Sequence, residues 1–355
     1  MVGERGLVSL GLGAVAAGLT AGAAAGAVLE RRLVRGPLRA PGAAPAALGA
    51  RHTHPTVVRA DDGVELYAEV DGPAPGVDPS RAPTVVLAHG YALNLDCWTF
   101  QRPALSQRCR VVLYDQRGHG RSGRGVAQRD TLAQLGADLA AVLDALAGPG
   151  PTVVVGHSMG GMALLAFAEA YPRRAAGLGA AALLATSAGQ LSRDGLGVPG
   201  PVGRWARGVA PALMSQLARR PGAVTWARRT GSDLEFALTR AYSFASPVSP
   251  SLVDFVAAMN SATPLDLLGD FLPEFDRHDR EAALVALAEV PTLVMVGAQD
   301  RLTPLEHSER LAAGLPGSVL EVLDPCGHML QLERPQQVSA ALERLLDRLP
   351  QPVAP

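Results

Sequence analysis

One short segment of the sequence combines a reactive hydroxyl with the glycines of a sharp turn. It reads Gly156-His157-Ser158-Met159-Gly160-Gly161 and follows three β-branched residues, Val153-Val154-Val155. An apolar, alanine-rich segment comes directly after it. This order predicts a buried strand, a tight turn and a helix, with Ser158 projecting from the sheet as a nucleophile. Gly156 and Gly160 would leave room for the turn, and the free N–H groups at the start of the helix would face the same spot.

A serine hydroxyl needs a base to accept its proton and an acid to orient that base. Asp300 follows a strand predicted at residues 292–296, and His328 follows a strand predicted at residues 318–323. Because an open α/β sheet places its ligands at the carboxyl ends of its strands, both side chains are expected near Ser158. The chain order Ser158, Asp300, His328 matches the serine–acid–histidine order of one known type of catalytic triad.

Each of these residues also has a structural interpretation. Taken alone, Asp300 could cap the helix predicted after Pro304, and His328 could be a loop histidine with satisfied hydrogen bonds. Their common position after predicted strands, in the right order, favours the catalytic interpretation. Asp324, four residues before His328 on the same loop, is interpreted as a solvated turn residue.

An acyl-transfer site also needs two N–H donors for the oxyanion. We predict that one is the backbone N–H of Met159, directly after the nucleophile. The other is expected from the loop after a strand at residues 84–88, where Tyr91 would supply its backbone N–H. In the same region, we interpret His89 as hydrogen-bonded within the loop and Trp98 as a packing residue.

The elements that would position these residues alternate between strands and helices. Residues 56–70 indicate a hairpin about the turn Asp61-Asp62-Gly63. The remaining predicted strands lie at residues 84–88, 111–114, 153–155, 180–184, 292–296 and 318–323, and the predicted helices at residues 131–146, after 304 and at 335–349. This alternation predicts an α/β fold with a mostly parallel, doubly wound sheet.

The alternation stops between residues 190 and 283, where amphipathic segments occur without a convincing strand. We predict a helical cap at residues 190–283, inserted into a core made of residues 56–189 and 284–350. Most aromatic residues of the cap are expected to fill its own core, and a few to line an apolar substrate pocket with Met214 and Met259. These aromatic residues are Trp205, Trp226, Phe236, Tyr242, Phe244, Phe255 and Phe271.

The first 35 residues form a hydrophobic segment, and residues 6–29 contain no charged side chain. As a single helix this run is long enough to cross a hydrocarbon layer of about 30 Å. Four arginines follow it within ten residues and one precedes it, which predicts a membrane anchor with the catalytic domain in the cytoplasm. The alternatives are a secretory signal, cut near residues 23–27 to release a secreted protein, and a disordered tail. Residues 36–55, rich in proline, glycine and alanine, would be a linker.

The composition excludes some classes of partner. The net charge is −1, with 32 basic side chains that are all arginine, so nucleic acid is not expected as a partner. The three cysteines, Cys97, Cys109 and Cys326, lack metal-type spacing and do not make an even disulfide set. We therefore expect no metal and no organic cofactor, and the oligomeric state stays open.

Five motifs together resemble the α/β-hydrolase fold superfamily over about residues 56–349. They are His89-Gly90, Asp115-Gln116-Arg117-Gly118-His119-Gly120-Arg121-Ser122, Gly156-His157-Ser158-Met159-Gly160-Gly161, Gly297-Ala298-Gln299-Asp300 and Gly327-His328. The second motif is similar to a turn shared by esterases, cofactor-free haloperoxidases and C–C hydrolases. Epoxide hydrolases and haloalkane dehalogenases of the superfamily use an aspartate nucleophile, so Ser158 argues against those chemistries. The elbow also departs from the Gly-Gly-Ser-Trp-Gly-Gly of proline iminopeptidases.

The residues and the resemblance together predict a serine hydrolase. Its expected substrate is a small to medium hydrophobic carboxylic ester, cleaved through an acyl-enzyme on Ser158. A C–C bond hydrolase acting on a diketone, or a haloperoxidase or perhydrolase, would use the same triad, so these alternatives stay open. A different class also stays open, namely a ligand-binding protein that keeps the fold and reacts slowly or not at all.

Overall fold

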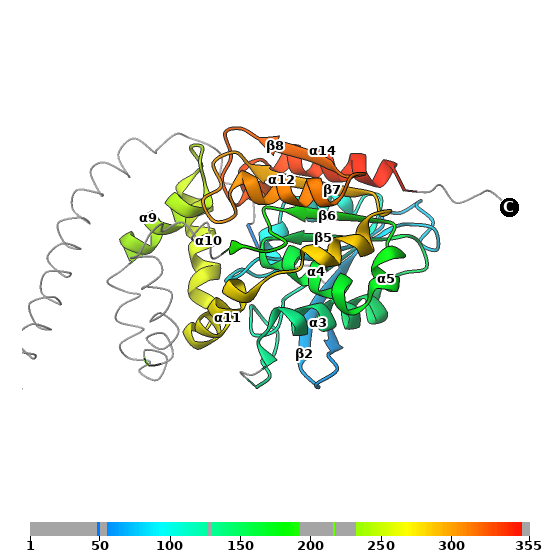
Figure 1. Cartoon of the computed structure of the whole chain (residues 1–355), viewed down its shortest axis with the longest axis horizontal. Coiled ribbons are helices and arrows are strands. Elements are labelled where there is room, and N and C mark those ends of the chain that lie inside the picture. The colour runs from blue at the N-terminus through cyan, green and yellow to red at the C-terminus, as the bar shows by residue number, and fades with distance from the viewer. Residues whose placement is uncertain (1–47, 50–54, 127–128, 192–215, 217–231, 350–355) are drawn as a thin grey trace, which may run out of the picture.

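Eight strands form a single sheet in the order β1-β2-β4-β3-β5-β6-β7-β8. The computed structural model describes residues 48–49, 55–126, 129–191, 216 and 232–349 (Figure 1). β1 and β2 form an antiparallel hairpin, β2 also runs antiparallel to β4, and all other neighbours are parallel. The predicted mostly parallel α/β sheet is therefore confirmed. The strands are β1 (Pro55–Arg59), β2 (Glu65–Asp71), β3 (Thr84–Ala88), β4 (Arg110–Tyr114), β5 (Thr152–His157), β6 (Ala180–Leu184), β7 (Thr292–Gly297) and β8 (Val319–Leu323).

Helices cover both faces of this sheet (Figure 1). Successive residues of β5 point to opposite faces, so Val153 and Val155 pack in one core cluster and Val154 in the other. Because both faces are buried, the central strands β3, β5, β6 and β7 are mostly apolar. One face is covered by η1 (Leu95–Trp98), α2 (Gln101–Leu105), α13 (Leu330–Glu333) and α14 (Pro335–Asp347). The other is covered by α3 (Leu132–Leu146), α4 (Met159–Ala170), α5 (Pro172–Ala176), η3 (Glu281–Leu287) and α12 (Leu305–Gly314).

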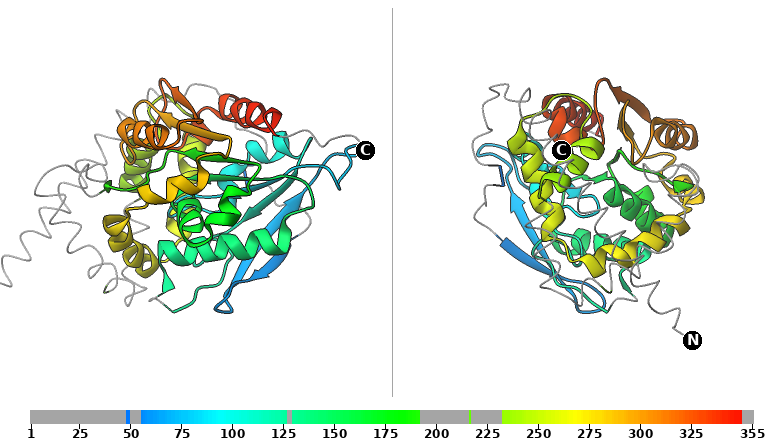
Figure 2. Two further views of the ribbon diagram at one scale, coloured as in Figure 1. Left: turned by 45° about the vertical axis from the view of Figure 1, so that its right-hand side comes forward. Right: turned by 90° about the vertical axis from the view of Figure 1, so that its left-hand side faces the viewer.

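Three further helices lie together at one end of the sheet, α9 (Ser232–Ser243), α10 (Pro250–Ala262) and α11 (Leu265–Arg277). They stand on the left of Figure 1 and face the viewer in the right-hand view of Figure 2. An isolated antiparallel bridge between Gly189 and Asp279 joins the two chain segments that lead into and out of this region.

These helices contact the loops that follow parallel strands. Tyr91, after β3, donates its hydroxyl hydrogen to the carbonyl of Leu268 at 2.6 Å. Met329, after β8, donates its backbone N–H to the carbonyl of Ser243 at 2.9 Å. The helices thus lie over the carboxyl ends of the strands. The boundaries of the cap at residues 190 and 283 stay a prediction.

The described aromatic residues of the cap are largely internal. Phe236, Phe244 and Phe271 are buried, while Tyr242 and Phe255 are half-buried. Phe236 and Phe244 belong to the core cluster that also covers one face of the sheet, and Phe271 packs with α4, so among the described residues these aromatics do not form a separate core of the cap. Trp205, Met214 and Trp226 lie outside the described residues.

The predicted membrane anchor at residues 6–29 also lies outside the described residues, as does most of the predicted linker. Among the helices that the structure describes, none combines the length and the apolar character needed to cross a membrane. The single N-terminal hydrophobic helix therefore stays a prediction.

Candidate active site

Ser158 occupies a strained turn between β5 and α4. Its backbone has φ 53° and ψ −118°, a conformation that residues other than glycine rarely adopt. The peptide groups around it hold the turn, because the Ser158 N–H donates to the carbonyl of Leu184 at 2.9 Å. The Ser158 carbonyl accepts from the hydroxyl of Thr186 at 2.7 Å and from the N–H of Gly161 at 2.9 Å. The strand, sharp turn and helix predicted from the sequence are all present.

Two glycines are needed for this turn because no side chain fits there. A Cβ atom on Gly156 would lie 2.5 Å from the carbonyl oxygen of Gly160. A Cβ atom on Gly160 would collide with the carbonyl of Ala88 at the end of β3. The loop after β3 therefore approaches the turn closely, as the predicted oxyanion site requires.

The structure brings Asp300 and His328 together. His328 Nδ1 lies 2.8 Å from Asp300 Oδ2, and each residue is only 5% exposed. Since the carboxylate can only accept, Nδ1 carries the hydrogen and Nε2 is left with the lone pair of a base. This is the tautomer that a proton acceptor for a serine hydroxyl needs.

Asp300 is held in its ionised form by several donors. Burial alone would raise the pKa of Asp300, but the neighbouring His328 and hydrogen bonds outweigh it and lower the pKa below its usual value. Oδ1 accepts from the N–H groups of Leu302 at 2.8 Å and Thr303 at 3.0 Å, and Oδ2 also accepts from the Thr303 hydroxyl at 2.9 Å. Asp300 therefore does two things at once: its carboxylate orders its own loop and accepts a hydrogen bond from His328.

His157, inside the elbow, contacts both the backbone and the ring of His328. Its Nε2 donates to the backbone carbonyl of His328 at 3.0 Å, and the two rings are 4.9 Å apart. Burial, reinforced by the nearby His328, lowers the pKa of His157 to about 3, so the ring is neutral at physiological pH. The contact between His157 and His328 is not predicted by the sequence, because the elbow pattern carries no information about which distant residue packs against His157.

The two predicted oxyanion donors lie beside the turn. A Cβ atom on Gly90 would be 3.1 Å from Ser158 Cβ, so the segment leading to Tyr91 lies next to the predicted nucleophile. Within the described part of the chain, the backbone N–H groups of Tyr91 and Met159 donate no hydrogen bond. An available N–H on each side of a serine is what an oxyanion site needs, and the role of the pair stays a prediction.

The residues interpreted as structural behave as such. His89 is fully buried, its Nδ1 donates to the carbonyl of Gly90 at 2.7 Å, and its Nε2 accepts from the N–H of Gln116 at 2.9 Å. Trp98 is fully buried in the core. Asp324 is exposed and accepts from Gln299 at 2.7 Å, with no contact to the His328 ring.

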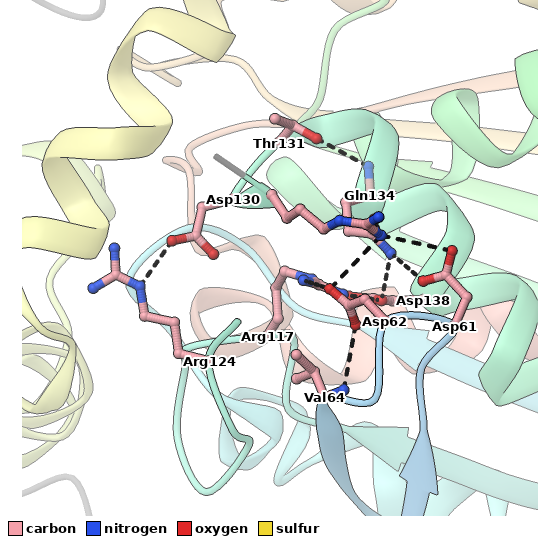
Figure 3. Close-up of polar contacts among 10 residues, drawn as sticks. Asp61, Asp62, Val64, Arg117, Arg124, Asp130, Thr131, Gln134 and Asp138 are labelled. Carbon is pink, nitrogen blue, oxygen red and sulfur yellow. Dashed lines mark hydrogen bonds and ion pairs between the residues drawn. The ribbon is translucent and has the colours of Figure 1, made fainter. Parts of the chain in front are cut away.

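A buried ion-pair network stabilises the loop after β4 (Figure 3). The guanidinium of Arg117 is completely buried and contacts Asp138 of α3 at 2.6 Å and Asp62 of the β1–β2 turn at 2.9 Å. Arg124, further along the loop, pairs with Asp130 at 2.8 Å. It also reaches α11 of the cap through Asp266 and Asp270, each at 2.6 Å. Arg117 of the shared turn motif therefore joins the hairpin to a core helix, and Arg124, two residues beyond the motif, joins the same loop to the cap.

Among the described residues, no group of three His, Cys, Asp or Glu side chains could hold a metal ion. Cys97, Cys109 and Cys326 are buried free thiols, and burial raises the pKa of the Cys109 thiol to about 11.

Comparisons with known proteins agree with this architecture. Residues 83–335 match the family model of the alpha/beta hydrolase fold. The chain belongs to the α/β-hydrolase fold family.

Two relatives are about 30% identical in sequence to this chain over the aligned residues. It is 31% identical over 292 residues to RutD of Caulobacter sp. (strain K31), a proposed carbamate hydrolase, covering 79% of this chain and 95% of the relative. It is 30% identical over 255 residues to the dihydrolipoyllysine-residue acetyltransferase component of an acetoin cleaving system from Pseudomonas putida, covering 72% of this chain but only 61% of that protein.

A thermophilic esterase from Thermogutta terrifontis superposes with a TM-score of 0.63 at 25% identity, covering 83% of this chain and 99% of the esterase. The family and its esterase and carbamate-hydrolase members identify the protein as a hydrolase.

Proposed function

We propose that the protein is a serine hydrolase that cleaves a small to medium hydrophobic carboxylic ester through an acyl-enzyme. The observation that supports this most strongly is the buried pair of His328 Nδ1 and Asp300 Oδ2 at 2.8 Å. It presents a basic nitrogen from the loop after β8, while Ser158 stands in a strained turn after β5. The relevant chemistry is attack on a carbonyl carbon, which needs these three groups in these roles.

In the first step, His328 Nε2 accepts the hydroxyl proton as Ser158 Oγ forms a bond to the carbonyl carbon. The carbonyl π electrons move to the oxygen, and the oxyanion accepts hydrogen bonds from the N–H groups of Tyr91 and Met159. Asp300, whose pKa is lowered, stays ionised and stabilises the imidazolium that forms. His328 then returns its proton to the leaving alkoxide as the carbon–oxygen bond breaks.

In the second step, water replaces the alcohol. His328 accepts a proton from water as the hydroxide attacks the acyl carbonyl, and the same N–H groups stabilise the second oxyanion. Return of the proton to Ser158 Oγ breaks the acyl bond and frees the acid. Every proton in this cycle passes through one nitrogen, so the tautomer fixed by Asp300 is decisive.

The preference for a hydrophobic acyl or aryl group rests on the side chains near the turn. Met159 and Met162 of α4 pack in one apolar cluster with Phe271 and Phe275 of α11, and Tyr91 packs against it. The rings of Tyr91 and Phe275 meet edge to face at 5.1 Å. Thioether and aromatic groups beside the oxyanion loop favour apolar substrates over charged ones.

Carbamates are a second candidate substrate class, because the relative with 31% identity is a proposed carbamate hydrolase. A carbamate also presents a carbonyl carbon to Ser158, but that carbon carries a nitrogen on its acyl side, so with a matched p-nitrophenyl leaving group the two classes differ only in the acyl group. A panel of p-nitrophenyl esters and matched p-nitrophenyl carbamates would rank them, with the ratio of kcat/KM as the readout.

Replacement of Ser158 by alanine tests the proposed function. We expect Ser158→Ala to lose p-nitrophenyl ester hydrolysis and labelling by a fluorophosphonate probe, while the cooperative unfolding transition is retained. Ser80→Ala, at an exposed serine hydrogen-bonded only to Asp78, is the matched control and should keep full activity. Unchanged turnover by Ser158→Ala would contradict the proposal, and a wild-type enzyme that neither labels nor turns over would favour a non-catalytic binding protein.

We further infer that residues 6–29 attach the protein to a membrane with the catalytic domain in the cytoplasm. The support is the uncharged run itself and the excess of arginine after it. Fractionation of cells expressing the full chain and a chain beginning at Val34 would test this. Recovery of the full chain in the soluble fraction would refute membrane attachment, and secretion of a shortened protein would indicate a signal peptide.

A further inference from the structure

The backbone around His328 is held by groups from outside its own loop. The N–H of Gly327 donates to Glu333 Oε2 at 2.8 Å, and the N–H of Met329 donates to the carbonyl of Ser243 at 2.9 Å. The carbonyl of His328 accepts from His157 at 3.0 Å. Three consecutive residues are thus fixed by three different elements, one of which is helix α9 of the cap.

Glu333 connects two of these elements. It is only 7% exposed, and among the described residues it forms no ion pair. Its carboxylate instead accepts backbone N–H groups from the cap turn between α9 and α10, from Ala245 at 3.1 Å and from Ser246. The same carboxylate accepts from Gly327. One buried negative charge therefore joins the loop of the predicted base to the cap.

The cap turn and this loop are also in direct contact. A Cβ atom on Gly327 would lie 2.9 Å from both the nitrogen of Ala245 and the carbonyl oxygen of Ser243. A buried carboxylate is stable only while its hydrogen bonds are made, and bonds to a charged acceptor are about twice as strong as neutral ones. Loss of the Glu333 charge would therefore loosen the cap turn and the base loop together.

We propose that Glu333 is a positioning residue that makes the alignment of His328 depend on the seating of the cap. The proposal rests on the proposed serine hydrolase function, in which His328 is the base. It assigns no contact with substrate to Glu333, which acts through the Gly327 peptide. A displacement of about 1 Å at a reacting group can cost about 100-fold in rate, so a small shift of this loop is sufficient.

The first test is Glu333→Gln, which keeps the size of the side chain but removes its charge. The amide has one acceptor oxygen, and its NH2 group would face backbone N–H donors. We expect kcat for p-nitrophenyl esters to fall by roughly 10- to 100-fold with KM changed by less than about 3-fold, because substrate binding is not the step affected. The rate of fluorophosphonate labelling of Ser158 should fall in the same proportion.

Glu69→Gln is the matched control for loss of a buried carboxylate. Glu69 is 1% exposed, pairs with Arg102 and lies on β2, near the opposite edge of the sheet from β8. It should lower the urea midpoint of unfolding but change kcat by less than about 2-fold. An equal loss of kcat in this control would mean that Glu333 acts only through stability, and would overturn the proposal.

Gly327→Ala provides a second test that leaves the carboxylate intact. Its Cβ would push the cap turn away from the base loop, so kcat should fall with KM nearly unchanged, even if Glu333→Gln does not fold. Wild-type kcat in a folded Glu333→Gln variant, or in Gly327→Ala, would overturn the proposal. Activity in Ser158→Ala would instead contradict the proposed function, so the two failures are distinguishable.

Discussion

Replacement of Asp300 by asparagine tests the orientation of the predicted base with little change in shape. Oδ1 of Asp300 accepts two backbone N–H groups, from Leu302 and Thr303, so the amide oxygen of an asparagine would remain at that position. The amide nitrogen would then take the place of Oδ2, which now lies 2.8 Å from His328 Nδ1. An N–H donor would replace an acceptor opposite the ring.

This exchange reverses the tautomer of His328. Nδ1 would accept from the new amide, and the ring hydrogen would move to Nε2, which could no longer accept the proton of Ser158. In serine enzymes the corresponding exchange lowers kcat about 10⁴-fold. At about 1.36 kcal/mol per tenfold change in rate, this is a loss of about 5 kcal/mol of transition-state stabilisation. We expect a loss of that order for Asp300→Asn, with KM little changed.

The assay is turnover of p-nitrophenyl esters together with the rate of fluorophosphonate labelling. Nitrogen-15 NMR of labelled histidine would show directly whether Nδ1 or Nε2 of His328 carries the hydrogen. Asp324→Asn is the matched control, because this acid is exposed on the loop of His328 and bonds to Gln299. A kcat for Asp300→Asn within about 10-fold of wild type would refute the assigned orientation.

Three further predictions concern stability, measured by urea unfolding. Asp138→Asn leaves the buried Arg117 with Asp62 alone and should lower the free energy of unfolding by about 3 kcal/mol; a loss under about 1 kcal/mol would mean that the buried pair is not needed. Asp266→Asn removes one ion pair of Arg124, in which the two side chains are 23% and 45% exposed; it should cost less than about 1 kcal/mol and lose its effect at high salt, and a salt-independent loss would contradict this. Stability should also fall from pH 6.5 towards pH 4, by about 1.4 kcal/mol per pH unit for each buried neutral histidine, because the unfolded chain takes up protons that the folded chain does not. Asp115, whose pKa burial raises to about 6, offsets part of this, and equal stability at pH 7 and pH 5 would contradict the prediction. The histidines are those whose pKa burial lowers: His119 to about 4, His157 to about 3, His278 to about 4, and His89 well below its usual value.

The parts of the site that could be predicted are those encoded locally. The elbow is contiguous in sequence, so a β-branched run, two glycines and an apolar segment were enough to predict strand, turn and helix around Ser158. Asp300 and His328 are distant in sequence, yet parallel strands bring their carboxyl ends to one edge of the sheet. The positions of these two residues after β7 and β8 therefore predicted their meeting.

The residues that hold the site in place could not be predicted from the sequence, because their contacts depend on which surfaces of the fold pack together. His157 and His328 are separated by 171 positions, and Ser246 and Glu333 by 87. A glutamate five residues after a histidine has no periodic or motif signal that identifies its partners. Likewise, Arg117 was part of a recognised motif, but its pairing with Asp138 depends on the docking of α3.

The cap contributes both to the apolar cluster near Tyr91 and to the contacts that hold the His328 loop. Helix α11 contributes Phe271 and Phe275 to the apolar cluster beside Tyr91, and the turn after α9 binds Glu333. A cap substitution that moves α11 together with the turn after α9 would therefore act both on this apolar cluster and on the segment that holds the His328 loop. If Glu333 positions the base as proposed, changes of specificity made in the cap will alter kcat as well as KM. A pocket built only from core loops would not couple the two constants in this way.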